Sequence, residues 1–231
     1  MPDGFPRSPR LIKGALIELA EPFLGPVPNV IVFQYNPETM KREFTPWSAP
    51  SDAEGAAAES TAQPYDPSET FDLTLELDAT DALEEADSHP VALVSGIADR
   101  IAAMEMLLYP VGDSLIGGAI ASLLGGGVPR ASVPVVLFAW GPGRIVPVRL
   151  VHFSVDETAF NALLYPVHAK VTVGLRVLTD AAFVKPGKIP TAAEALAIMA
   201  YKWTRGQKET LARTNLMNSA ESIAGMIPLP F

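Results

Sequence analysis

Strict alternation of apolar and polar residues marks two segments of the chain as strands. In residues 71–78, Phe71 and three leucines fall on one side of an extended chain, and Asp72, Glu76 and Asp78 fall on the other. Residues 167–177 alternate over a longer run. A period of two is typical of a strand with one buried face, so both segments are predicted to be half-buried antiparallel strands.

A third apolar segment, residues 133–139, does not alternate. Such a run is expected of a strand that is covered on both faces or lies at an interface between subunits. The Gly-Pro-Gly sequence at 141–143 predicts a turn directly after it, because glycine accepts positive φ and proline fixes its own. Further predicted strands are residues 11–20, 30–35, 40–44 and 146–155.

Helical spacing occurs in the middle of the chain and again near its end. In residues 91–109, one face of the predicted helix carries Val91, Val94, Ile97, Ile101, Met104 and Leu108. Thr191 and Glu194 have the spacing of a capping box, which predicts a helix that ends near Thr204. A second short helix is predicted over residues 207–218.

Composition narrows the classes of function. The chain has 231 residues, of which 48% are hydrophobic, so it can bury a sizeable core. Its formal net charge of -9 disfavours binding to nucleic acid or to anionic membranes. No segment has the roughly 20 consecutive apolar residues of a membrane helix, so no membrane insertion is expected.

Few residues have the chemistry of a catalytic or metal centre. His152 and His168 could meet across neighbouring strands near Asp156 and Glu157. A metal site needs three or four converging donors, however, and the chain has three histidines and no cysteine. The glycine run at 125–127 lacks the Gly-Lys-Ser/Thr ending of a phosphate loop. We therefore expect no enzyme activity, no cofactor and no metal site.

Four motifs occur in a characteristic order along the chain. They read KGALI at 13–17, FQYNPE at 33–38, PVVLFAWG at 134–141 and TAFNALLYPVHAKV at 158–171. In order and spacing they resemble the tube-type domain of contractile injection systems, which are machines similar to phage tails. Together the motifs cover roughly the length of that domain.

This resemblance implies a mainly β fold. We expect a β-barrel or sandwich of two curved antiparallel sheets with one flanking helix over residues 1–183, including a long loop at 45–67 and an insertion at 110–130. Residues 184–231 are expected to form a helical tail that docks on a partner. Part of that tail, residues 192–215, resembles the helix pair of a LysM domain, so a degenerate LysM-like segment stays open.

The resemblance also implies a structural role. The expected function is that of a baseplate or tube-initiator adaptor, assembled in the cytoplasm, which forms a ring of six copies as in the family. The ring would join the inner tube to the spike hub, so the expected partners are further copies, the inner-tube protein, the spike or hub protein and other baseplate proteins. Two alternatives stay open: a plain inner-tube subunit, and a soluble β-barrel enzyme or ligand-binding module.

Candidate contact residues follow from this interpretation. A ring closes through a heterologous contact between neighbouring subunits. Exposed strand edges are expected to form this contact. The candidates for that interface are Val30, Val32, Phe33, Tyr35, Asn36, Pro37, Val136, Phe138 and Trp140, although packing within the chain is favoured for Trp140. The candidates for the lumen of the ring are Asp72, Glu76 and Asp78, and those for docking of the tail are Trp203, Leu211 and Phe231.

Overall fold

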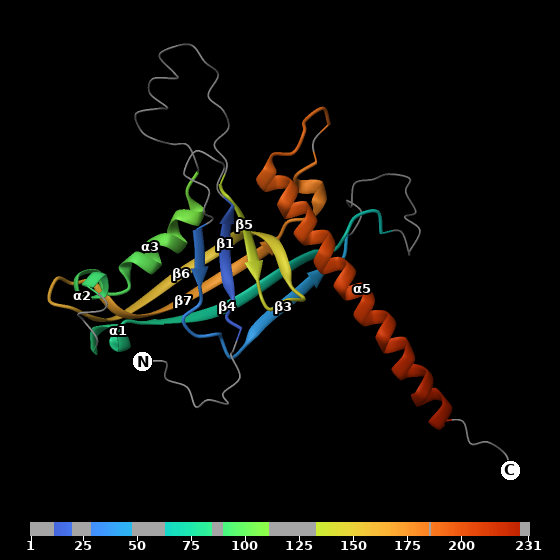
Figure 1. Cartoon of the computed structure of the whole chain (residues 1–231), viewed down its shortest axis with the longest axis horizontal. Coiled ribbons are helices and arrows are strands. Elements are labelled where there is room, and N and C mark those ends of the chain that lie inside the picture. The colour runs from blue at the N-terminus through green and yellow to red at the C-terminus, as the bar shows by residue number, and fades with distance from the viewer. Residues whose placement is uncertain are drawn as a thin grey trace, which may run out of the picture.

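A single antiparallel sheet forms the body of the protein. The computed structural model describes residues 12–19, 29–47, 63–84, 90–110, 133–184 and 186–226. Within these ranges the chain forms one seven-stranded sheet, several short helices and one long C-terminal helix (Figure 1). This confirms the mainly β class with a helical tail. All seven strands belong to one sheet, where two curved sheets were expected.

The strands follow the order β2-β1-β5-β6-β7-β4-β3 across the sheet, and every neighbouring pair is antiparallel. Their bounds are β1 Ala15–Leu19, β2 Asn29–Val32, β3 Met40–Thr45, β4 Ser68–Asp78, β5 Val135–Ala139, β6 Ile145–Phe160 and β7 Pro166–Val177. Each lies within or close to a segment predicted from the sequence. The largest difference is β6, which continues beyond residue 155 to pair with β7 along almost its whole length.

Short helices and one long helix complete the fold. Their bounds are α1 Thr80–Glu84, α2 Pro90–Ser95, α3 Ala98–Glu105, the 3₁₀ turns η2 Met106–Leu108 and η3 Asp180–Ala182, and α5 Ala192–Met226. Most of the predicted loop at 45–67 and of the insertion at 110–130 falls outside the described residues. The domain boundary near residue 183 stays a prediction.

The sheet curls strongly around its core. The rings of Phe71 in β4 and Phe138 in β5 lie 5.3 Å apart between centroids, although β6 and β7 separate their strands. In a flat sheet, strands three places apart would lie roughly 14 Å from each other. The concave face therefore closes upon itself, and α3 adds Ile101 and Met104 to the buried cluster that fills it.

Two side-chain amides join the start of β1 to the end of β4 at one end of the curl. The Asn36 side chain accepts a bond from the Gly14 N–H (2.8 Å) and donates to the Ile12 carbonyl (2.9 Å). Gln34 does the same for Asp78, donating to its carbonyl (2.7 Å) and accepting from its N–H (3.0 Å). Each amide replaces a missing strand neighbour, so the segment after β2 connects β1 to β4.

The helix predicted over residues 91–109 is broken at Gly96. This residue has φ 58°, and a side chain there would place its first carbon 2.1 Å from the Pro166 carbonyl oxygen. The Ile97 N–H donates to that same oxygen (2.9 Å), which fixes the break against β7. Ile97, Ile101 and Met104 are buried, whereas Val91 and Val94 of α2 and Leu108 of η2 lie exposed, so the prediction of one shared helix face was wrong.

The tail forms one continuous helix where two were predicted. Thr191 and Glu194 form the predicted capping box, in which the Thr191 N–H donates to the carboxylate (2.8 Å) and the Glu194 N–H to the hydroxyl (3.3 Å). Gly206 lies in the predicted gap between the two helices but does not interrupt α5. The helix also contains no proline, the residue that would break it. The first half of α5 packs on β5 and β6, and the rest projects beyond the sheet (Figure 1).

This packing explains the uniformly apolar strand. Phe138 of β5 points into the curl, whereas Leu137 points the other way and packs with Phe183 and with Ala197 of α5. Of the two possibilities left open for residues 133–139, the structure shows a strand covered on both faces by its own chain.

Candidate functional site

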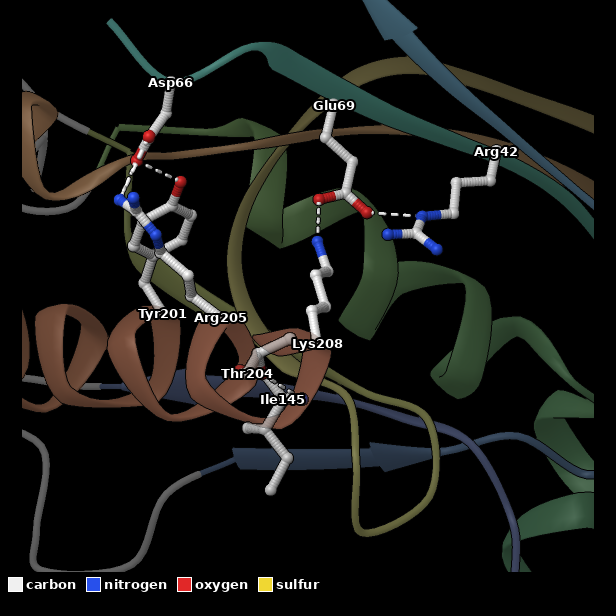
Figure 2. Close-up of polar contacts among 8 residues, drawn as sticks. All are labelled: Arg42, Asp66, Glu69, Ile145, Tyr201, Thr204, Arg205 and Lys208. Atoms are coloured by element: carbon white, nitrogen blue, oxygen red, sulfur yellow. Dashed lines mark hydrogen bonds and ion pairs between the residues drawn. The ribbon is translucent and has the colours of Figure 1, made fainter. Parts of the chain in front are cut away.

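A buried carboxylate holds α5 on the sheet (Figure 2). Glu69 at the start of β4 is only 5% exposed and accepts two charged hydrogen bonds. One comes from Arg42 Nε in β3 (2.6 Å), the other from Lys208 Nζ in α5 (2.7 Å). A buried charge without partners is strongly unfavourable. Because its two cations come from different elements, Glu69 joins β3, β4 and α5.

A second carboxylate on the same side binds the preceding turn of α5. The Arg205 guanidinium lies 2.9 and 3.0 Å from the two Asp66 oxygens, and the Tyr201 hydroxyl donates to Asp66 over 2.8 Å. Burial, with added effect from the bond to Asp66, raises the pKa of Tyr201 well above its ordinary value. The phenol is therefore a neutral donor at physiological pH.

Thr204 completes the contact between α5 and the sheet. Its hydroxyl is almost fully buried and donates to the Ile145 carbonyl (2.7 Å). The Thr204 hydroxyl oxygen in turn accepts a hydrogen bond from the Ile145 N–H (3.0 Å). Both backbone groups of Ile145, at the start of β6, are therefore paired. We call these residues together the polar clamp: Arg42, Asp66, Glu69, Tyr201, Thr204, Arg205 and Lys208.

The clamp residues were not predicted as functional. Asp66 and Glu69 lie more than 130 positions from their α5 partners in sequence. Only one signal was available: Tyr201, Thr204 and Lys208 are spaced as one face of a helix. A polar stripe of that kind normally faces solvent, and only the curl of the sheet brings acidic residues to it.

Shallow clefts on the described surface include a small one of about 80 Å³ between η2, β5 and β6, and two larger ones. One, of about 250 Å³, borders the clamp between Phe44, Glu69 and Tyr201. The other, of about 270 Å³, lies between Tyr35, Glu76 and neighbouring residues on the convex face. Both are below the range of roughly 300–1,000 Å³ that is usual for small-molecule sites.

The histidines considered as metal ligands do not meet. His152 of β6 lies opposite Gly174, whereas His168 of β7 lies opposite Thr158 and shares a 2.7 Å hydrogen bond with its hydroxyl. The two imidazoles are thus six positions apart along paired strands. Within the described ranges, His, Asp and Glu residues form no grouping that could hold a metal ion.

The predicted interface residues divide into two groups. Three are buried in the core of the chain: Phe33, Val136 and Phe138. Trp140 packs on Phe33 and Phe138 with ring centroids 6.5 and 6.0 Å apart, which confirms the packing interpretation. Val30, Val32 and Tyr35 are each about half exposed and lie on or just after edge strand β2, beside Asn36 and Pro37. Val30, Val32 and Tyr35 are therefore accessible for contact with a neighbouring subunit.

The predicted lumen residues lie on one face of β4. Asp72, Glu76 and Asp78 point away from the core, but basic side chains accompany them. Lys170 of β7 lies 3.5 Å from Glu76, and Lys41 of β3 lies opposite Asp72. The convex face therefore carries mixed charge in the described strands, and a uniformly acidic wall is not present there.

Beyond the clamp, α5 continues as an arm, by which we mean residues 209–226. Every side chain from Glu209 to Leu216 is exposed, including Leu211. Trp203, one turn before the clamp ends, is exposed as well, whereas Phe231 lies outside the described residues. Two of the three predicted docking residues are thus available at the surface.

No family matches. A scan against models of protein families finds none that fits the sequence, and a search of curated proteins finds no similar chain. No helix in the described part of the chain is both long and apolar enough to cross a membrane. The features of the described residues that could serve a function are surfaces for contact with other proteins. They are the edge strand β2, the clamped part of α5 and the arm.

Proposed function

We propose that the protein is a structural adaptor of a contractile injection system. In this role it forms a ring, of six copies by family resemblance, that joins the inner tube to the spike hub and the baseplate. The inner-tube protein, the hub protein and other baseplate proteins are its partners.

The placement of the four motifs supports this proposal. PVVLFAWG forms β5 and the turn that follows it, and TAFNALLYPVHAKV covers the end of β6, the turn and the start of β7. KGALI leads into β1, and FQYNPE is the segment whose amides connect β1 to β4. The family-like motifs therefore lie on strands and turns of one curled sheet, and this placement supports a fold shared with the family.

The clamped helix with its projecting arm is the observation that carries the proposal. A helix of 35 residues is far longer than the sheet can cover. The polar clamp fixes its first half, so the second half is held away from the sheet in a constant direction (Figure 1). A helical arm that projects from a rigid body is suited to bridging two components of an assembly.

The test is the position of the protein in assembled particles. The chain carries a small N-terminal tag in its native host, particles are purified, and bound antibody is located by electron microscopy. Because an adaptor occupies one level of the particle, label is expected at one end only. Label along the whole tube would instead indicate a plain inner-tube subunit, and absence from particles would overturn both roles.

A truncated chain tests the arm. Ending the chain after Arg213 removes most of the arm and leaves one helical turn beyond Lys208. This variant is expected to keep its fold but to lose its place in the particle, because the bridging contact is missing. Normal incorporation of the truncated chain would contradict a bridging role for the arm.

A further inference from the structure

Exposed apolar side chains gather at one end of the molecule. We call them the apolar tip: Val91, Leu93 and Val94 of α2 with Phe160 at the end of β6 and Leu163, Leu164 and Tyr165 of the turn that follows. Their exposed fractions range from 43% for Tyr165 to 80% for Leu164. Large apolar side chains that cluster at the surface mark contact sites more often than isolated ones do.

The tip is held rigidly in this exposed form. The Asn161 side-chain oxygen accepts the N–H groups of Leu163 (2.9 Å) and Tyr165 (3.0 Å), and its amide donates to the Val94 carbonyl (3.1 Å). Leu164 has φ 63°, a conformation that few leucines adopt. These bonds link the turn to α2, so the apolar side chains cannot fold back into the core without breaking them.

A second apolar surface lies on α5. Leu196, Met199 and Trp203 follow helical spacing and are between 46% and 67% exposed. Ala197 and Thr204, on the side toward the sheet, are fully buried. We call this outer side of α5, before the arm begins, the helix face.

The charges around the two surfaces are complementary. Exposed acidic residues outnumber basic ones in the elements that adjoin the apolar tip, with Glu84, Asp99, Asp156 and Glu157 against Arg100 and Lys170. Lys202 is exposed beside Trp203 on the helix face and forms no ion pair with any residue that the structure describes. Acidic residues around one apolar surface and a lysine beside the other favour contact between the two.

In Figure 1, α2 and the β6–β7 turn lie at one end of the long axis, whereas the first half of α5 lies well apart from them, over β5 and β6. We propose that the apolar tip of one copy docks on the helix face of the next copy. The surfaces differ, so the contact is heterologous and repeats from copy to copy, closing into a ring when the rotation allows. This inference deepens the proposed ring and rests on it.

Two variants remove one surface each. Leu163→Gln with Leu164→Asn removes apolar area from the tip, and asparagine tolerates the positive φ. Leu196→Gln with Met199→Gln does the same on α5 with a good helix former. In sedimentation velocity of the purified full chain over a range of concentrations, each is expected to weaken self-association at least about tenfold. Val151→Thr, at an exposed β6 position outside both surfaces, should leave it unchanged.

Mixing the two variants is the decisive measurement. Each retains the surface that the other lacks, so the mixture is expected to form complexes of one copy each and nothing larger. Renewed binding also shows that both variants are folded. Three results would overturn the proposal: a wild-type chain that stays monomeric, a single variant that self-associates like the wild type, or tip-dependent binding to phosphatidylcholine vesicles in place of self-association.

The failure of this contact and of the proposed function can be told apart. If particles carry the label at one end while both variants associate like the wild type, the adaptor role stands and the tip contact is wrong. If the variants behave as expected but the chain is absent from particles, the contact stands and the adaptor role is wrong.

Discussion

Glu69 shows how much a single residue can determine in this fold. It lies almost out of solvent between Arg42 and Lys208, so replacing it leaves two cations facing each other without their anion. Glu69→Gln keeps the shape of the side chain and removes its charge. We expect a loss of about 1–3 kcal/mol in the free energy of unfolding, measured by urea denaturation.

Glu76 is the matched control for that experiment. It also forms an ion pair, with Lys170 at 3.5 Å, but both partners are about half exposed. Solvent-exposed pairs contribute little, so Glu76→Gln should change the free energy of unfolding by less than about 1 kcal/mol. Equal effects of the two substitutions would mean that the buried clamp contributes no more than a surface pair.

Asp78 predicts a specific dependence on pH. The Thr80 hydroxyl and then the Thr80 N–H donate to its carboxylate, and these bonds lower the pKa of Asp78. A lowered pKa in the folded state stabilises the fold above the ordinary carboxyl pKa of about 4, and the gain is lost as pH falls through the folded value. Asp78→Asn should therefore be less stable than the wild type at pH 7, with the difference shrinking toward pH 3.

The carboxyl titration itself checks the cause. Thr80→Val removes the hydroxyl donor and keeps the N–H donor, so the pKa of Asp78, followed by NMR, should move up toward its ordinary value. An unchanged pKa in this variant would assign the shift to the backbone bond alone.

Among the elements, the strands could be predicted and the breaks between them could not. Alternation in residues 71–78 and 167–177 follows from burial on one face, which is a local property of the sequence. The interruption at Gly96 depends on the Pro166 carbonyl, which lies 70 positions away. Likewise, Gln34 and Asn36 appear in sequence as ordinary polar residues, and only the curled sheet shows which strands they join.

Gly96, between α2 and α3, and Gly206, inside α5, should respond in opposite directions to the same substitution. At Gly96 the backbone has φ 58° and a methyl group would collide with the Pro166 carbonyl, so Gly96→Ala should cost roughly 2 kcal/mol or more. At Gly206 nothing lies within 4 Å of the added carbon, and Gly206→Ala should stabilise α5 by about 1 kcal/mol. Thermal unfolding of both variants checks the signs; a gain for Gly96→Ala would contradict the tight approach of β7.

For the molecule as a whole, the central question is whether the sheet is complete without α5. The sequence suggested a domain ending near residue 183 with a separate tail. In the structure the tail supplies Ala197 to a buried cluster with Leu137 and Phe183, and it supplies the lysine that pairs with Glu69. The first half of α5 therefore contributes to the body of the protein, and only the arm resembles an appendage.

Two truncations distinguish a dispensable tail from an integral helix. A chain ending after residue 183 exposes the outer face of β5 and leaves Glu69 with Arg42 alone, so it is expected to aggregate or to melt far below the full chain. A chain ending after Arg213 keeps every clamp residue, and its melting temperature should match that of the full chain. Circular dichroism on heating measures both. A cooperative fold for residues 1–183 with full stability would show that α5 merely rests on a finished sheet, and the arm's fixed direction would then need another cause.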